Sequence, residues 1–393
     1  MDERDVLTTQ VQLLLQQLNW AEQMLQGLPL TAALRKAVAT SFANRFNDER
    51  GELEQLQAAL SKSPNVATYW NTLTRRNAKC RALFNECLSF IGGVLIREYK
   101  LKDGAALDGG ICRIADALLG ELMNQTPQLY PAFTLLAESN FFTETTGIVR
   151  LRFPEYSIWN LPVAVHELGH YAMRRIDDGT GSFPFDKFPA DKLQKLATEQ
   201  QRSAHLKEYL ADLFAVYTLG PAYLCACLVW RFNPQDETAR ADGAQHPSHA
   251  KRLHFMLRTL ELMNPASDYV YSGPIKMLRA LWQSSWQSAD QSIELEPQTL
   301  GALQVMHKEV YQLLDENLSS ARYARWPQGE KLAKLLATDQ PAAQLLNADS
   351  KLTDVVNAVW LWRVRQQGTD AEQLRQVGER ALDLCWRLAQ QQH

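Results

Sequence analysis

The amino-acid sequence predicts a mainly α-helical protein with one short β-structured stretch. Apolar residues recur at three- and four-residue spacing through most of the 393 residues, which is typical of helices that bury one face. Clear alternation of apolar and polar residues occurs in the run GIVRLRF, residues 147–153, which predicts a strand. With 46% apolar and 22% charged residues, the chain has the composition of a folded globular protein of two or three domains.

We expect three regions along the chain. Residues 1–140 are predicted to form an N-terminal helical region, residues 141–265 a core that carries the chemistry, and residues 266–393 a C-terminal helical region. The first region begins with the helical pattern LLLQQLNWAEQMLQGL, which Gly27 and Pro29 end. This glutamine-rich start could also form a coiled-coil seam, although its apolar run is short for a heptad pattern.

Helical spacing resumes after the predicted strand, at Asn160. This residue is a suitable N-cap, and Pro162 is tolerated in the first turn. The sequence HELGH at 166–170 is therefore expected within a helix. The Gly- and Pro-rich run DDGTGSFPFDKFPAD that follows is a predicted loop, whose three phenylalanines either pack locally, which we favour, or cover a site as a lid.

Charge and targeting signals argue against several classes of protein. The 41 basic and 44 acidic residues give a net charge of −3, so we expect no nucleic-acid partner. The start MDERDVLTTQ lacks the layout of a signal peptide, and six scattered cysteines fit buried, reduced thiols, so we expect a cytoplasmic protein. The apolar run 213–230 is divided by Gly220 and Pro221, which favours two core helices over insertion into a membrane.

Two histidines of HELGH have the spacing of metal ligands. On a helix, residues four apart share a face, so His166 and His170 can converge on one ion, while Glu167 projects beside it. A carboxylate in that place can take the proton of a zinc-activated water. The alternative is a helix with two half-buried histidines. Gly169 argues against it, because a glycine inside a helix costs about 1 kcal/mol relative to alanine and usually marks the close approach of another backbone.

A third ligand is expected downstream, because a tetrahedral catalytic zinc is commonly held by three protein groups. The sequence EYLAD at 208–212 supplies a candidate. Glu208 can reach the ion, and Asp212, four residues later on the same predicted face, can accept the ring N–H of a ligand histidine. Two histidines and one glutamate would leave the fourth position open, which is a catalytic arrangement.

The order HELGH, EYLAD and then HPSHAKRL at 246–253 resembles the HExxH, ExxAD and HPxxxxR series of the prenyl-protein endopeptidase family and its bacterial stress-protease relatives. These enzymes are gluzincin zinc peptidases, and the resemblance covers about residues 147–260. It implies a zincin-type catalytic core with a small β-sheet. It also implies Zn²⁺ as cofactor, with His166, His170 and Glu208 as its ligands.

The same resemblance implies roles for four further residues. Glu167 matches the general base and Asp212 the partner of a ligand histidine, while His246 and Arg252 match the third motif. Pro247 suits the first turn of a helix and so puts His246 at the N-terminal end of that helix. There the His246 side chain can donate a hydrogen bond to the developing oxyanion. Arg252 is expected either to orient the site or to hold it together by pairing with a carboxylate. The alternative oxyanion donors are His249 and His254, and His246 could instead only cap the helix.

The sequence is therefore interpreted as that of a cytoplasmic zinc endopeptidase acting on a protein or peptide substrate. GIVRLRF is expected to be an edge strand against which an extended substrate pairs. Two alternatives stay open: a zinc hydrolase of a non-peptide amide, and a catalytically inactive helical scaffold or interaction protein.

Overall fold

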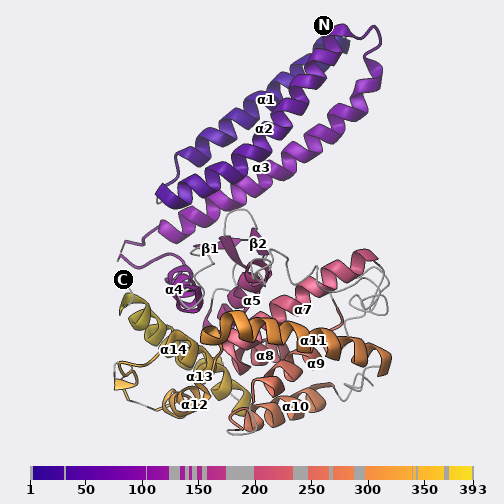
Figure 1. Cartoon of the computed structure of the whole chain (residues 1–393). Helices are drawn as coiled ribbons and strands as arrows, with labels where there is room; N and C mark the ends of the chain where they lie inside the picture. The colour runs from indigo at the N-terminus through magenta and orange to yellow at the C-terminus, as the bar shows by residue number, and fades with distance from the viewer. Residues whose placement is uncertain are drawn as a thin grey trace. The chain divides into compact units, whose positions relative to one another are not determined.

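The computed structural model describes most of the chain. The described residues are 3–30, 32–102, 104–123, 133–137, 141–143, 148–152, 157–173, 199–232, 247–264, 269–286, 297–338, 340–341, 344–366 and 371–391. Helices dominate them, which confirms the mainly α-helical class (Figure 1). The predicted loop that follows HELGH and the candidate donor His246 lie outside the described residues.

The chain divides into two compact units. The first comprises residues 1–109, 135–139 and 143–148, and the second comprises residues 110–134, 140–142 and 149–393. Both the expected core at 141–265 and the expected C-terminal region at 266–393 therefore fall in the second unit, apart from the stretch 143–148. The structure thus joins the HELGH and EYLAD sequences and the C-terminal helices in one compact unit.

The first unit contains three long helices: α1 (Glu3–Gln26), α2 (Ala32–Lys62) and α3 (Trp70–Glu98) (Figure 1). Helix α1 contacts both of the others. Its buried residues are spaced alternately four and three apart: Leu7, Val11, Leu14, Leu18, Ala21 and Leu25. This spacing keeps one narrow apolar seam against the neighbouring helices.

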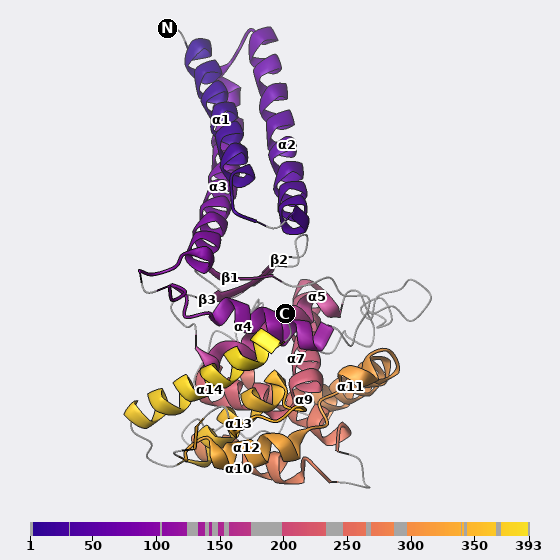
Figure 2. The same ribbon diagram turned by 90° about the vertical axis from the view of Figure 1, so that its left-hand side faces the viewer.

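The second unit is built from shorter helices (Figure 2). They are α4 (Ile111–Met123), α5 (Leu161–Ala172), α7 (Glu199–Leu219), α8 (Pro221–Ala226), α9 (His249–Leu262), α10 (Ser272–Trp286), α11 (Pro297–Leu318), α12 (Trp326–Leu335), α13 (Leu352–Arg365) and α14 (Ala371–Gln391). Short 3-10 turns occur at Ile158–Asn160 and Ser319–Ala321, and a π-helical turn at Cys227–Arg231 follows α8. Helix α13 is buried on every side from Leu352 to Trp362 and contacts α4, α8, α12 and α14, so it is the central helix of this unit.

The strands β1 (Phe133–Ala137), β2 (Phe141–Thr143) and β3 (Ile148–Arg152) form one sheet in the order β1-β3-β2. The strand predicted within GIVRLRF is confirmed. Its assignment as an edge strand is wrong, because β3 lies between the other two and its backbone pairs on both sides. Alternation of apolar and polar residues predicts a strand with one buried face, and Val149 and Leu151 are buried. It carries no information about how many strands pair with that strand.

The apolar run 213–230 is interrupted as predicted. Helix α7 ends at Leu219, Gly220 adopts a positive φ of 71°, and α8 begins at Pro221. Among the described helices, none has the length and apolar character needed to cross a membrane. All six cysteines are buried and unpaired with one another, as expected for structural thiols.

Candidate metal centre

Helix α5 carries the HELGH sequence, which confirms that the motif is helical. Asn160 stands at the N-cap position without a side-chain capping bond, and Pro162 lies in the first turn. The motif occupies the second half of the helix rather than its middle. Of the twelve residues of α5, His170 alone is not buried. A helix buried this completely needs partners on every face, and α7 is the main one.

Gly169 allows α5 and α7 to approach closely. A Cβ placed on it would lie 2.9 Å from both the Cα and the carbonyl oxygen of Ala211. The glycine therefore meets the backbone of the EYLAD sequence, which is the close approach that its position in a helix predicts. This contact brings the two candidate metal-binding motifs, one on each helix, against one another.

His166, His170 and Glu208 come together where α5 and α7 meet. Their candidate ligand atoms all lie within 4.8 Å of one another, so the group could hold a metal ion. The Nε2 atom of His166 is 3.5 Å from Oε2 of Glu208, and Nε2 of His170 is 3.4 Å from Oε1 of the same carboxylate. His166 and Glu208 are buried, whereas the His170 side chain is 22% exposed. Solvent therefore reaches the group on the His170 side.

The two histidines have opposite electrostatic environments. Burial acts to lower the pKa of His166, but hydrogen bonds to Asp212 and Glu208 outweigh it and raise this pKa to about 9. Burial and the neighbouring charge of His166 lower the pKa of His170 to about 3. A metal ligand must be a neutral imidazole, so His170 is already in its binding form at neutral pH, whereas a cation must displace a proton from His166.

Asp212 stands behind His166 as the sequence suggests for a partner of a ligand histidine. Its Oδ1 is 3.0 Å from Nδ1 of His166, and its carboxylate accepts two hydrogen bonds from Arg252, at 2.8 Å from Nε and 2.7 Å from Nη2. Although burial opposes ionisation, the charge of Arg252 and the hydrogen bond from His166 lower the pKa of Asp212 to about 2. The carboxylate is thus a buried anion held by donors. Arg252 also lies 3.3 Å from Glu208.

We expect Arg252→Gln to lower the free energy of unfolding of the metal-free chain by about 3–5 kcal/mol. The change would remove the guanidinium that donates two hydrogen bonds to the fully buried Asp212 carboxylate. Arg258→Gln, on the same helix α9, removes an exposed ion pair with Glu261 and should change the free energy by less than about 1 kcal/mol. Denaturant unfolding of both variants in a chelator measures this difference, and equal effects would contradict the role given to Arg252.

Glu167 is buried beside the group. Burial raises the pKa of its carboxyl group, while the charges of His166, Arg231 and Arg252 act in the opposite direction. A carboxylate whose pKa is raised binds a proton more readily than a free one, which suits a group that accepts and then returns a proton in hydrolysis.

The alternative donors on α9 differ in their surroundings. The His249 ring stacks on Phe232, with centroids 4.6 Å apart, and the guanidinium of Arg252 lies over the same Phe232 ring. Burial lowers the pKa of His254, and the charges that act on it come from the outer ion pairs around Glu261 rather than from Glu208 or Asp212.

Tyr223 is the residue at this centre that sequence patterns missed. It lies on α8, and its hydroxyl is 2.9 Å from Nδ1 of His166 and 2.6 Å from Oδ1 of Asp212. The one sequence signal is its place in the first turn after Gly220 and Pro221, and this predicts a helix start without indicating which residues lie opposite.

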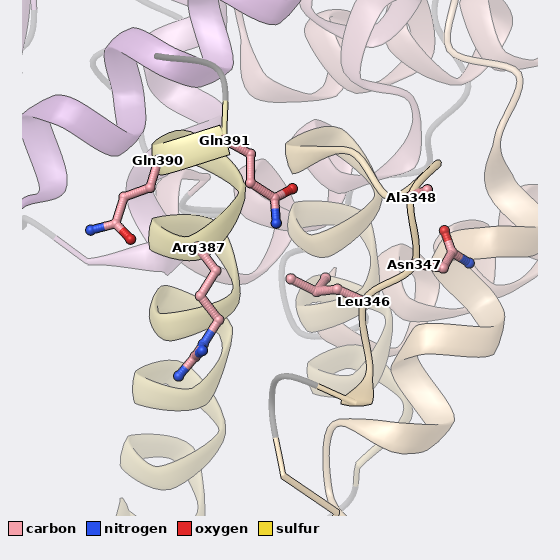
Figure 3. A pocket seen from close by; sticks show the side chains of 6 residues that line it. All are labelled: Leu346, Asn347, Ala348, Arg387, Gln390 and Gln391. Atoms are coloured by element: carbon pink, nitrogen blue, oxygen red, sulfur yellow. The ribbon is translucent and has the colours of Figure 1, made fainter.

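A separate pocket of about 440 Å³ lies between the end of α14 and the segment before α13 (Figure 3). It is lined by Leu346, Asn347, Ala348, Arg387, Gln390 and Gln391. These side chains include no acid, histidine or cysteine, so this pocket lacks the imidazole, thiolate and carboxylate groups that bind zinc. The group at His166 is therefore the candidate functional site.

Comparisons of the chain with protein-family models, with curated proteins and with solved structures found no match.

Proposed function

We propose that this chain is a zinc-dependent endopeptidase with a gluzincin-type centre. The observation that carries the proposal is the convergence of His166, His170 and Glu208 from two helices, with His166 and Glu208 buried. Two imidazoles and one carboxylate suit zinc, and three protein ligands would leave a position open for catalysis. The order of the HELGH, EYLAD and HPSHAKRL sequences supports the same class and favours peptide bonds as the substrate.

Each neighbouring side chain then has a defined task. A zinc ion, when bound, would polarise the substrate carbonyl and make water nucleophilic near neutral pH. Glu167 takes the proton of the attacking water and returns it to the leaving amine. Asp212 accepts the Nδ1–H of His166 and so keeps Nε2 free as a ligand. Arg252 keeps Asp212 ionised. His246 as the oxyanion donor stays a prediction.

We expect the purified chain to bind about one zinc ion, because the three ligands form one site. Elemental analysis after dialysis measures the stoichiometry. The His166→Ala, His170→Ala double variant should retain none. Zinc bound at the same ratio by the double variant would place the metal elsewhere and contradict the assignment.

Hydrolysis of a peptide library by the zinc-loaded chain tests the activity itself. Cleavage within peptides, abolished by a chelator and restored by zinc, is the expected result. A zinc-loaded chain that cleaves only non-peptide amides would make the substrate assignment wrong. A zinc-loaded chain that hydrolyses neither kind of amide would be a metal-binding scaffold without this activity.

A further inference from the structure

Tyr223 packs against the side of His166 that faces away from Glu208. Its ring stacks on the imidazole, with centroids 5.6 Å apart and an angle of 13° between the planes. The hydroxyl donates to Oδ1 of Asp212 at 2.6 Å and lies 2.9 Å from Nδ1 of His166. The side chain is buried, so these contacts are not shared with bulk water.

The proton count at Nδ1 determines the tautomer of His166. The hydroxyl of Tyr223 has one proton, and the short bond to Asp212 uses it. The oxygens of both Tyr223 and Asp212 can therefore only accept from Nδ1. The neutral imidazole must carry its proton on Nδ1, which leaves the lone pair on Nε2, the atom that faces Glu208.

The hydroxyl also helps to hold Asp212 in place. Arg252 occupies both carboxylate oxygens from one side, and Tyr223 adds a donor to Oδ1 from another helix. A carboxylate that accepts hydrogen bonds from two helices has little freedom to rotate away from the histidine. A carboxylate fixed in this way orients the imidazole of a ligand histidine.

Asn357, on the central helix α13, places Tyr223. Its side-chain oxygen accepts from the backbone N–H of Ala222 at 3.1 Å, and its amide donates to the carbonyl of Leu219 at 2.7 Å. These two bonds bracket Gly220, at which an added Cβ would overlap the ring of Tyr323. The turn between α7 and α8 is thus held from both sides, one residue before Tyr223.

We propose that Tyr223 is a positioning residue of the metal centre, which selects the ligating tautomer of His166. We also propose that Asn357 holds Tyr223 in position. The inference rests on the proposed function, since it requires that His166 bind a metal. It gives the C-terminal helical region a task. Through Asn357 on α13, that region helps to hold the centre in place, although Asn357 lies 134 positions beyond Tyr223 in the sequence.

The test is the zinc dissociation constant of Tyr223→Phe, measured by competition with a chelator of known affinity. Phenylalanine keeps the ring that stacks on His166 and removes only the hydroxyl. We expect zinc to bind about 10- to 100-fold more weakly, as is typical when a partner of a ligand histidine is lost. The melting temperature of the metal-free variant should stay within a few degrees of that of the wild type.

Tyr217→Phe is the matched control. Tyr217 lies on α7, the helix of Glu208, and its hydroxyl also donates to a carboxylate, that of Asp315, at 2.7 Å. Removing this hydroxyl should change the zinc dissociation constant by less than about twofold, because the bond lies outside the metal centre. An equal weakening in both variants would show a general effect of losing a buried hydroxyl and would overturn the inference.

Asn357→Leu tests the second part. The side chain is of similar size but cannot bond to Ala222 or Leu219, so zinc should bind at least about tenfold more weakly as Tyr223 shifts. A lower melting temperature with an unchanged zinc dissociation constant would show that Asn357 supports only the fold.

The outcomes separate the inference from the proposed function. A wild-type chain that binds no zinc would overturn the proposed function. A wild-type chain that binds zinc, with Tyr223→Phe binding it equally well, would overturn the inference alone. A Tyr223→Phe chain that does not fold in the presence of a chelator would also overturn it, because the hydroxyl would then be part of the fold rather than a positioning group.

Discussion

Glu167→Gln is expected to lower the turnover number for peptide hydrolysis by about 10²- to 10⁴-fold, with zinc content unchanged. The amide has nearly the shape of the carboxylate but cannot accept the proton of the attacking water. The buried environment that raises the pKa of Glu167 also prevents bulk water from replacing it as a base. Steady-state kinetics on a cleavable peptide, with elemental analysis of the same sample, measures both quantities.

Glu261→Gln is the control for this change. Glu261 lies on α9 and pairs with Arg258 and Arg279 near the surface, so the same loss of charge should leave turnover within about twofold of the wild-type value. Full activity of Glu167→Gln would show that another group serves as the base. Loss of zinc from Glu167→Gln would instead show that this carboxylate holds the metal.

Gly169→Ala should weaken zinc binding by at least about tenfold and lower the free energy of unfolding by roughly 1–3 kcal/mol. The new methyl group would meet the Ala211 backbone at 2.9 Å, so α5 and α7 would have to separate by several tenths of an ångström. His166 and His170 lie on one of these helices and Glu208 on the other, so any separation pulls the ligands apart. Metal sites tolerate deviations of only about 0.2 Å.

Gly120→Ala provides the comparison. Gly120 lies within α4 of the same unit, and a Cβ there would meet nothing within 4 Å. This alanine should stabilise the chain by up to about 1 kcal/mol through helix propensity and should leave zinc binding unchanged. Denaturant unfolding and chelator competition on both variants give the two measurements. If Gly169→Ala behaves as Gly120→Ala does, the close approach of α5 and α7 does not limit the centre.

The ligand spacing was readable from the sequence because it depends on local geometry. Residues four apart on a helix share a face whatever surrounds them, and this relation holds for His166 with His170 and for Glu208 with Asp212. Gly169 indicated a nearby backbone for an equally local reason, since a helix interior disfavours glycine. These patterns predicted the residues that meet at the centre before any knowledge of how the helices pack.

The neighbours of β3 and the support of the centre could not be predicted in the same way. Alternation in GIVRLRF reports one buried face, whereas the position of β3 between two strands depends on where the chain returns. Tyr223 and Asn357 belong to ordinary apolar helical patterns, and nothing in their spacing relates them to His166.

What the sequence by itself determined is therefore the helical class, the interruption at Gly220 and Pro221, and the candidate ligands, all of which follow from interactions within a few residues. The tertiary structure alone decided that α13 holds the turn before Tyr223 through hydrogen bonds. It also decided that the Asp212 carboxylate contacts His166, Tyr223 and Arg252 together. The physical reason is distance along the chain. These contacts join residues between 11 and 138 positions apart, and their partners are chosen by the packing of whole helices rather than by local periodicity.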